Sequence, residues 1–420
     1  MLKFIHTADL HLGSPFSGIK EFNERLASAL FEATFLAFNK IIDLCIFHHV
    51  DFLLIAGDIY DSEDRNIRAQ LKFRDALSRL SEKGIYTYIV HGNHDPLNGW
   101  SATLKWPKHV YIFSDPNLNV EKIPYIKNGQ KLAHIHGISF PQKNITENLA
   151  KRFKREKGAP FSIGLLHCNI GTNTGHEPYA QSSIEDLIKS GMDYWALGHI
   201  HKPQILKENP TIIYPGNPQG RDPGESGERG CYLIEVDNSL RIKPQFIPVD
   251  RIRWIHRDID ITKIDEEDEL INLIRNESNL PYLDDELSYI IRIKLLGRSP
   301  LYKQFLNYPD MFDAIQEEIN QEFQGLPFIW IERIENEVKP PIDISSRIKA
   351  QDFIGDLLRL IEEYKKNPSN LEELRSLLAP LFSNYSKARS ILEDEVEDKE
   401  ILAMLDKAEA YLIDALIEEV

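Results

Sequence analysis

The sequence FLLIAGDIYD, at residues 52–61, decides the fold that we expect for this chain. Its five apolar residues run directly into Gly57 and Asp58. A short apolar run of this kind is typical of a buried strand in a parallel sheet, and a glycine at its end allows a sharp turn. Asp58 would then lie at the carboxyl end of the strand, where open α/β sheets place their ligands. For this motif alone, the alternative is an aspartate that only caps the next helix.

Two further strands in the first half of the chain end in polar residues. Residues 2–7 lead to Asp9 and His11, and residues 85–90 lead to the sequence HGNHD at 91–95. The β-α-β-α-β order implies right-handed crossovers and a parallel sheet, so that all three polar clusters would share one edge. Apolar residues at helical spacing predict the two intervening helices, over residues 21–49 and 63–83.

Histidines also follow two strands predicted farther along the chain. Residues 161–166 lead to His167, and residues 194–197 lead to His199 and His201. Two histidines that are two residues apart in extended chain point to the same side, as do Asp9 and His11. Other short strands are predicted over residues 132–138, 211–214 and 231–236.

Length, charge and cysteine content restrict the class of protein. At 420 residues the chain is long enough for two or three domains. Its net charge of −16 argues against a protein that coats nucleic acid by bulk electrostatics, although bound divalent cations change the field at a nuclease site. We find no apolar run near the roughly 20 residues that span a bilayer, no signal peptide and no disulfide framework. We expect a cytoplasmic protein that does not enter a membrane.

The side chains that follow these strands suit a metal centre. Imidazoles, carboxylates and an amide together favour a divalent ion of intermediate hardness, such as Mn, Fe or Zn. One D-x-H motif would be weak evidence, but five clusters that each end a predicted strand indicate a common site. The candidates are Asp9, His11, Asp58, Asn93, His94, His167, His199 and His201.

The motifs D-x-H, G-D-x-x-D, G-N-H-D, a lone histidine and G-H-x-H, in that order, resemble those of the calcineurin-like metallophosphoesterases. The Gly- and Pro-rich stretch at residues 215–230 and the segment after it look like one branch of that family, the bacterial DNA-repair exonucleases of the SbcD and YhaO type. The resemblance implies an α/β fold for residues 1–250, a β-sandwich flanked by helices.

The remainder of the chain changes character near residue 250. Residues 251–341 alternate strand and helix patterns and predict a small α+β capping domain. Residues 342–420 form an acidic tail with amphipathic helical stripes. This tail could bind a partner protein, bind a second copy of the chain in a homodimer, or pack on itself.

The family resemblance also implies a ligand set. It predicts two divalent metal ions, with Mn²⁺ as the first choice and Fe or Zn as alternatives. One ion is assigned to Asp9, His11, Asp58 and His201. The other is assigned to Asp58, Asn93, His167 and His199, with Asp58 as the bridge. His94 remains as the acid that meets the leaving oxygen, and Asp61 matches the carboxylate that orients it.

The implied activity is that of a metal-dependent DNA exonuclease in DNA repair. Its implied partners are DNA and an SMC-like coiled-coil ATPase. The sequence has no G-x-x-x-x-G-K-[ST] motif, so any ATP-driven step must come from a partner. Two alternatives remain: a phosphodiesterase or phosphatase that acts on nucleotides or other small phosphate esters, and a non-catalytic scaffold.

Several basic residues are candidates for contacts to DNA phosphates, which position DNA without reading its sequence. The densest basic run is KRFKREK at residues 151–157, for which the alternative is the solvated face of a helix. We assign no function to His6, His134 or His136. The candidate DNA contacts are Arg65, Arg68, Lys151, Arg152, Lys154, Arg155 and Arg221.

Overall fold

The first sheet of the computed structural model is built around β2 (Phe52–Ala56), whose five side chains are all buried. β1 (Leu2–Thr7) and β3 (Tyr86–Val90) lie parallel to β2 on its two sides, so the predicted parallel core is confirmed. β4 follows β3 in parallel, whereas β11 and β12 extend the sheet beyond β1 in antiparallel pairs. These added strands are β4 (Val110–Ile112), β11 (Gly230–Val236) and β12 (Ile242–Pro248).

The structure describes most of the chain, with gaps. The described residues are 1–14, 24–61, 67–99, 104–115, 117–171, 180–278, 287–321, 327–341, 344–383 and 398–417. Arg65, one of the candidate DNA contacts, lies outside them.

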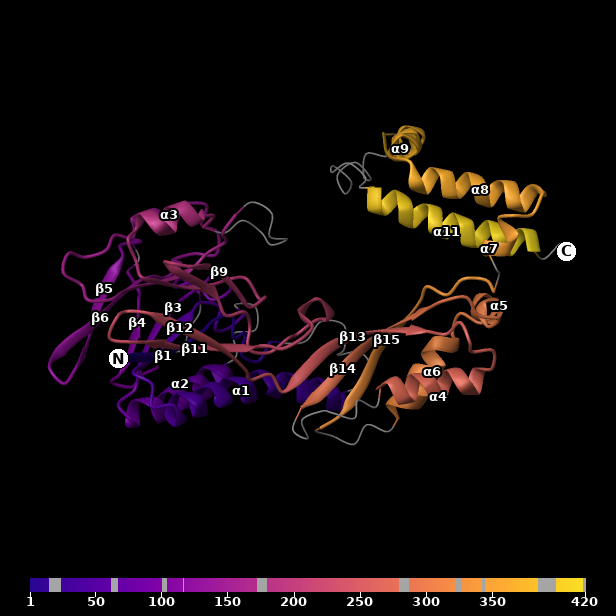
Figure 1. The fold of residues 1–420 in the computed structure, drawn as a ribbon. Helices are drawn as coiled ribbons and strands as arrows, with labels where there is room; N and C mark the ends of the chain where they lie inside the picture. Colours follow the sequence, from indigo (N-terminus) through magenta and orange to yellow (C-terminus); the bar gives the residue numbers. More distant parts are fainter. Residues whose placement is uncertain are drawn as a thin grey trace. The chain divides into compact units, whose positions relative to one another are not determined.

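Two helices cover one face of the first sheet (Figure 1). α1 (Glu24–Phe47) follows β1, and α2 (Ile67–Glu82) follows β2. Their apolar side chains, such as Ile41 and Leu77, are buried with Ile5 and other residues of the sheet. The helical spacing in the sequence therefore predicted both elements correctly over the residues that are described.

A second sheet packs on the other face of the first. Its strand order is β5-β6-β7-β8-β10-β9, and β6, β7 and β8 run parallel. Phe4 and Phe52 of the first sheet stack with ring centroids 5.0 Å apart and are buried together with Ile135 and Ile163 of the second. The strands are β5 (Glu121–Lys127), β6 (Gln130–Ile138), β7 (Ser162–His167), β8 (Tyr194–Gly198), β9 (Gln204–Glu208) and β10 (Thr211–Tyr214).

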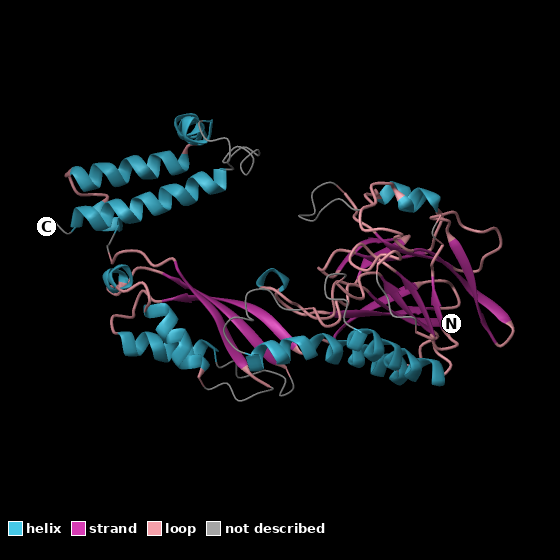
Figure 2. Cartoon of the chain, turned by 180° about the vertical axis from the view of Figure 1, so that it is seen from behind, coloured by secondary structure: helices cyan, strands magenta, loops and turns pink. Residues whose placement is uncertain are grey.

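Short helices cover the outer face of the second sheet. Figure 2 shows the chain from the side opposite to that of Figure 1. The 3-10 helix η1 (Leu149–Arg152) and α3 (Ile184–Lys189) lie there, and Phe153 and Trp195 are buried with them. The predicted α/β fold, a sandwich of two sheets flanked by helices, is confirmed.

The described chain forms two compact units. The first comprises Met1–His256, Pro281–Ile291 and Glu322–Trp330, and the second comprises Arg257–Leu280, Arg292–Gln321 and Ile331–Val420. Three strands form a third sheet, β13 (Ile252–Asp260), β14 (Ser288–Leu296) and β15 (Ile329–Asn336). The boundaries 250 and 341 remain predictions.

Each strand of the third sheet is divided between the two units, and the remaining regular elements described in the second unit are helices. In its last part, Lys365 on α8 contacts Glu409 on α11 at 2.5 Å, and Ile354 and Leu358 are buried. No helix in the described part of the chain is both long enough and apolar enough to cross a membrane. The helices are α4 (Glu267–Ser278), α5 (Tyr302–Asn307), α6 (Met311–Asn320), α7 (Ile344–Arg347), α8 (Phe353–Lys366), α9 (Pro368–Ser383) and α11 (Asp398–Ile417).

Candidate metal centre

The loops after β1 and β2 are joined by backbone hydrogen bonds. The amide of Asp9 donates to the carbonyl of Gly57 at 3.0 Å. The amide of His11 donates to the carbonyl of Asp58, also at 3.0 Å. Asp9, His11 and Asp58 have φ values of 52°, 43° and 51°, and His199 has a φ of 102°. Non-glycine residues rarely adopt such angles, which cost about 1–3 kcal/mol each and cluster at functional sites.

Two glycines leave room for the side chains of the centre. A Cβ atom on Gly57, whose φ is 91°, would lie 2.4 Å from Nδ1 of His167. A Cβ atom on Gly92 would lie 2.2 Å from Oδ1 of Asp58. Both distances are shorter than non-bonded atoms tolerate, so close packing requires both glycines, and the positive φ of Gly57 favours a glycine there as well.

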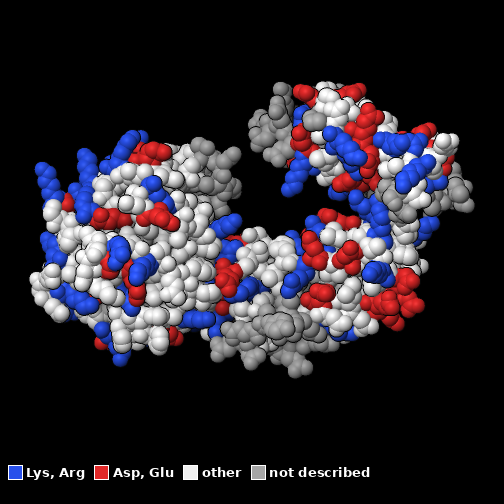
Figure 3. Space-filling view, in the orientation of Figure 1, with Lys and Arg blue, Asp and Glu red and all other residues white. Residues whose placement is uncertain are grey.

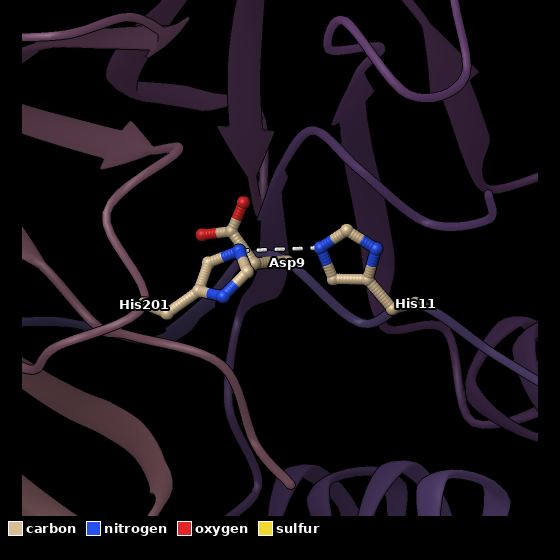
Figure 4. Close-up of side chains that lie close together, drawn as sticks. All are labelled: Asp9, His11 and His201. Atoms are coloured by element: carbon tan, nitrogen blue, oxygen red, sulfur yellow. Dashed lines mark hydrogen bonds between the residues drawn. The ribbon is translucent and has the colours of Figure 1, made fainter. Parts of the chain in front are cut away.

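Asp9, His11 and His201 form a first group of possible metal ligands (Figure 4). One ligand atom of each lies within 4.8 Å of the others. Asp9 and His11 follow β1 of the first sheet, whereas His201 follows β8 of the second. The Nε2 atoms of His11 and His201 are 3.3 Å apart, across the dashed line in Figure 4.

Carboxylates behind the two imidazoles determine which nitrogen of each carries the proton. Nδ1 of His11 donates to Asp61 at 2.8 Å. Nδ1 of His201 donates to Glu225 at 2.5 Å. In a neutral imidazole the lone pair is then on Nε2. Two lone pairs therefore face each other beside the carboxylate of Asp9, and a divalent cation between them would stabilise this arrangement.

Asp58 and His167 form a second group with Asp9, and all three are buried. Nδ1 of His167 donates to the carbonyl of Ala56 at 2.9 Å, which again leaves the lone pair on Nε2. That Nε2 lies 3.0 Å from Oδ1 of Asn93 and 3.4 Å from Oδ2 of Asp58. Electron-rich atoms converge here as well, so this donor set also fits a divalent cation.

His199 lies beside the second group. Its ring meets that of His167 edge-on, with centroids 5.2 Å apart. Its amide donates to both carboxylate oxygens of Asp9, at 3.0 and 3.1 Å. The structure thus brings all seven predicted metal ligands together at the carboxyl ends of strands from both sheets.

Asp61 contacts His94, the predicted acid, as well as His11. Nδ1 of His94 is 2.9 Å from Oδ1 of Asp61, and its amide donates to Asp58 at 2.9 Å. The His94 side chain is 43% exposed, so it is accessible to a substrate, unlike the buried ligands. Asp61 also accepts hydrogen bonds from Ser14 and, at 3.2 Å, from Arg221.

Burial and neighbouring charges shift the pKa values of the two central carboxylates in opposite directions. Burial, followed by the charge of Asp58, raises the pKa of Asp9 well above its ordinary value. Burial also acts to raise the pKa of Asp58, but the imidazoles of His167, His11 and His94 together lower it to about 2. Two carboxylates in one buried site repel each other unless cations lie between them.

His11 and His94 have pKa values that are shifted in opposite directions. Burial, followed by the charge of Arg221, lowers the pKa of His11 to about 4. His11 is therefore neutral near pH 7, as a metal ligand must be. Burial acts to lower the pKa of His94, but the hydrogen bond to Asp61 and the charges of Asp58 and Asp61 together raise it.

Glu225 is a functional candidate that no sequence motif indicated. It lies in the Gly- and Pro-rich stretch at residues 215–230, and its carboxylate accepts from Nδ1 of His201. It also accepts from the side chain of Asn217 and the amide of Arg221, both at 2.7 Å. Asp222 caps the short helix η2 (Pro223–Glu225) that presents it. A single carboxylate in an irregular loop has no regular spacing from other polar residues that a sequence motif could reveal. Its contact with His201 is visible only in the folded structure.

The predicted DNA contacts are dispersed. Arg221 lies in the metal centre, whereas Arg68 is exposed on α2 with Glu32 3.9 Å away. The run at residues 151–157 lies on η1 and the segment after it, and contacts Glu147 and Asp193. The helical alternative for this run is wrong beyond η1, because residues 153–157 are not helical.

The sequence matches two family models. Residues 2–203 match the model described as calcineurin-like phosphoesterase. Residues 254–339 match the model described as metallophosphoesterase YhaO, middle domain. The first match covers β1 to β8 of the sandwich, and the second covers most of the third sheet.

Relatives of known name match over most of the chain. The chain is 37% identical to the uncharacterized metallophosphoesterase YhaO of Bacillus subtilis, over 86% of this chain and 87% of that protein. It is 25% identical to the DNA double-strand break repair protein Mre11 of Saccharolobus solfataricus, over 91% of this chain and 99% of that protein. It is also 25% identical to a subunit of the nuclease SbcCD of Staphylococcus saprophyticus, over 60% of this chain and 70% of that protein.

Proposed function

Because the chain belongs to the calcineurin-like metallophosphoesterase family, whose members use divalent metals, we propose that it is a metal-dependent DNA exonuclease that acts in DNA repair. The observation that carries the chemical part is the relation between His11 and His201. Both imidazoles direct their lone pairs at one point beside Asp9, and carboxylates behind them hold that orientation. Such an arrangement suits phosphoester hydrolysis by metal ions.

Two ions, with Mn²⁺ as the preferred metal, would occupy the two groups of ligands. One ion would be held by Asp9, His11, Asp58 and His201. The other ion would be held by Asp58, Asn93, His167 and His199. When bound, the ions would neutralise charge on the phosphoryl group and activate the attacking water. One carboxylate oxygen of Asp58 lies 3.4 Å from Nε2 of His167 in the second group, and that group also contains Asp9 of the first group. This proximity supports Asp58 as the residue that both ions would share.

His94 then acts as the general acid. Asp61 holds its Nδ1 and leaves Nε2 free to donate a proton to the leaving oxygen. The same hydrogen bond raises the pKa of His94, which keeps the ring protonated to a higher pH. Arg221 adds a positive charge beside Asp61, within the site that would receive a phosphate.

The proposal that DNA is the substrate is supported by the names of the relatives. One of them is named as a DNA double-strand break repair protein and another as part of a nuclease. We base the proposed partner, an SMC-like coiled-coil ATPase, on the same branch of the family. This partner would supply any ATP-driven step, because the sequence has no ATP-binding motif of the G-x-x-x-x-G-K-[ST] type. The cytoplasmic location and the homodimer stay predictions.

The test is release of nucleotides from end-labelled linear duplex DNA by the purified protein with Mn²⁺, with and without ATP. His94→Ala is the matched variant, and a bis-aryl phosphodiester is the small substrate. We expect degradation that requires Mn²⁺ and that falls by roughly 10²–10⁴-fold in the variant, because an acid contributes about that factor. Cleavage of the small ester without any cleavage of DNA would contradict the proposed substrate.

A further inference from the structure

The charges of this protein are strongly segregated along the sequence. Residues 104–157 contain eleven Lys and Arg against four Asp and Glu, a net charge of +7. The rest of the chain carries −23. A long basic segment in an otherwise acidic protein attracts a polyanion and so favours its approach at that segment.

The fold gathers much of this charge on the outer face of the second sheet. Leu149, Ala150 and Phe153 are buried against the sheet, so that Lys151 and Lys154, between and beside them, are exposed. Figure 3 shows Lys and Arg side chains gathered over the part of the first unit where Figure 1 labels β5, β6 and α3.

The edge strand β5 joins the same face. Lys122 on β5 pairs in register with His136 on β6. Burial, followed by the charge of Lys122, lowers the pKa of His136 to about 4, and Arg155 acts on it in the same direction. Glu156 is 2.9 Å from His134, two residues earlier on β6. The basic segment and the β5–β6 pair therefore form one surface.

The arginines of this surface are already used within the fold. Arg152 makes two hydrogen bonds to Glu147, of 2.7 and 2.8 Å, and a third to the carbonyl of Leu118. Arg155 is bound to Asp193 and to the carbonyls of Gly191 and Ala159. They fix the segment after η1 in place and have little freedom to bind another molecule.

The lysines of this surface differ from its arginines. Lys122, Lys151, Lys154 and Lys157 are all exposed, and none of them forms an ion pair with a carboxylate in the described ranges. We call these four residues the lysine face. An ammonium group is a point charge on a flexible stem, which suits phosphate groups at varying positions better than a single shaped ligand.

We propose that the lysine face binds the sugar-phosphate backbone of duplex DNA outside the metal centre. This inference rests on the proposed function, because it assumes a polymeric phosphodiester as substrate. β6 leads from this face toward the centre: the amide of Phe140, just beyond β6, donates to the carbonyl of His91 at 3.1 Å, next to Asn93 and His94. Duplex DNA bound to the lysine face would therefore contact a surface that β6 connects to the loop that holds Asn93 and His94.

The test compares two charge-matched variants in duplex binding. One is Lys122→Gln, Lys151→Gln, Lys154→Gln and Lys157→Gln, and the other changes four exposed lysines elsewhere, Lys83→Gln, Lys243→Gln, Lys263→Gln and Lys349→Gln. The readout is fluorescence anisotropy of a labelled duplex of about three helical turns over a salt series, with circular dichroism to confirm folding. Both variants lose four charges, so a difference between them reports position and not net charge.

We expect the lysine-face variant to bind at least tenfold more weakly near 0.15 M salt. The slope of log affinity against log salt should become shallower by about 3.6, because each of the four lost phosphate contacts removes roughly 0.9. The control variant should bind like the wild type. Cleavage of a bis-aryl phosphodiester with Mn²⁺ should be unchanged in both variants.

Unchanged affinity and slope in the lysine-face variant, with DNA still degraded, would overturn the lysine face and leave the proposed function intact. A wild type that cleaves the small ester but neither binds nor degrades DNA would overturn the proposed function. Equal losses in both variants would also overturn the lysine face, since net charge alone would then explain binding. Binding by the wild type to phosphatidylserine vesicles but not to DNA would overturn it as well and identify a different polyanion.

Discussion

His11 and His201 direct their Nε2 atoms at each other across 3.3 Å, although 190 positions separate them in the chain. Each is held from behind by its own carboxylate, Asp61 for His11 and Glu225 for His201. The two carboxylates lie in different loops and are linked by Arg221, which contacts Asp61 through its side chain and Glu225 through its amide. The orientation of these two imidazoles therefore depends on residues outside the predicted ligand set.

Glu225→Gln should weaken metal binding. The variant keeps the size of the side chain but removes the charge that orients His201, and loss of such a partner costs roughly 10–100-fold in metal affinity. Isothermal titration with Mn²⁺ measures the change. Glu228→Gln in the same loop is the control, because that side chain is 57% exposed and contacts Arg253 away from the centre. Equal Mn²⁺ affinity in both variants would contradict the role of Glu225.

Asp61→Asn should move the pH profile of kcat/KM. A general acid must be protonated, so activity is lost as the pH rises through its pKa. Asp61 raises the pKa of His94, and without its charge this pKa falls. The alkaline limb should therefore shift to lower pH, measured with a small phosphodiester at saturating Mn²⁺. If the limb stayed at the wild-type position, another group would be the acid.

Gly57→Ala should destabilise the metal-free protein far more than Gly84→Ala. Both glycines have positive φ, 91° and 72°, but only Gly57 has a neighbour, His167, in the space of a Cβ atom. The Gly84 variant should lose about 1 kcal/mol from backbone strain alone. The Gly57 variant should lose about 3 kcal/mol or more, because His167 or its strand must move. Urea unfolding in the presence of a chelator measures the free energy of unfolding of both variants. Equal losses of this free energy would mean that the structure around Gly57 adjusts to a Cβ atom without additional cost.

His6→Gln should flatten the pH dependence of stability. Burial lowers the pKa of His6 to about 3, from 6.5 in the unfolded chain, so the unfolded state binds more protons between these values. Stability contributed by neutral His6 is thus full above pH 6.5 and is lost as the pH falls toward 3. Between about pH 7 and about pH 5 the wild type should lose about 2 kcal/mol more than the variant in urea unfolding with chelator. Parallel losses in the two proteins would show that His6 is not the responsible group.

The sequence predicted the parts of this fold that depend on local pattern. The apolar runs that end at Asp9, Asp58 and His167 are strands, and parallel pairing brings their ends together as the β-α-β order requires. The sequence did not predict β5, because Pro124 and its charged neighbours suit an exposed edge strand, which has no clear apolar pattern.

The supporting contacts of the centre could not be predicted in the same way. Glu225 reaches His201 only after a loop with no regular element has folded, and Asp61 reaches His11 as well as His94. The close approach of His167 to Gly57 depends on how the two sheets pack, which no local pattern records. Sequence motifs identified the groups that face the centre, whereas the contacts behind them emerged from tertiary structure.

The division of the ligands between two sheets has a consequence during synthesis. A ribosome releases Asp9, His11 and Asp58 early, but His167, His199 and His201 follow more than a hundred residues later, and Glu225 after them. A nascent chain that has folded only its first strands lacks these later donors and cannot assemble either ligand group in full. The order of the chain itself therefore delays completion of both predicted ligand groups until the second sheet has been synthesised.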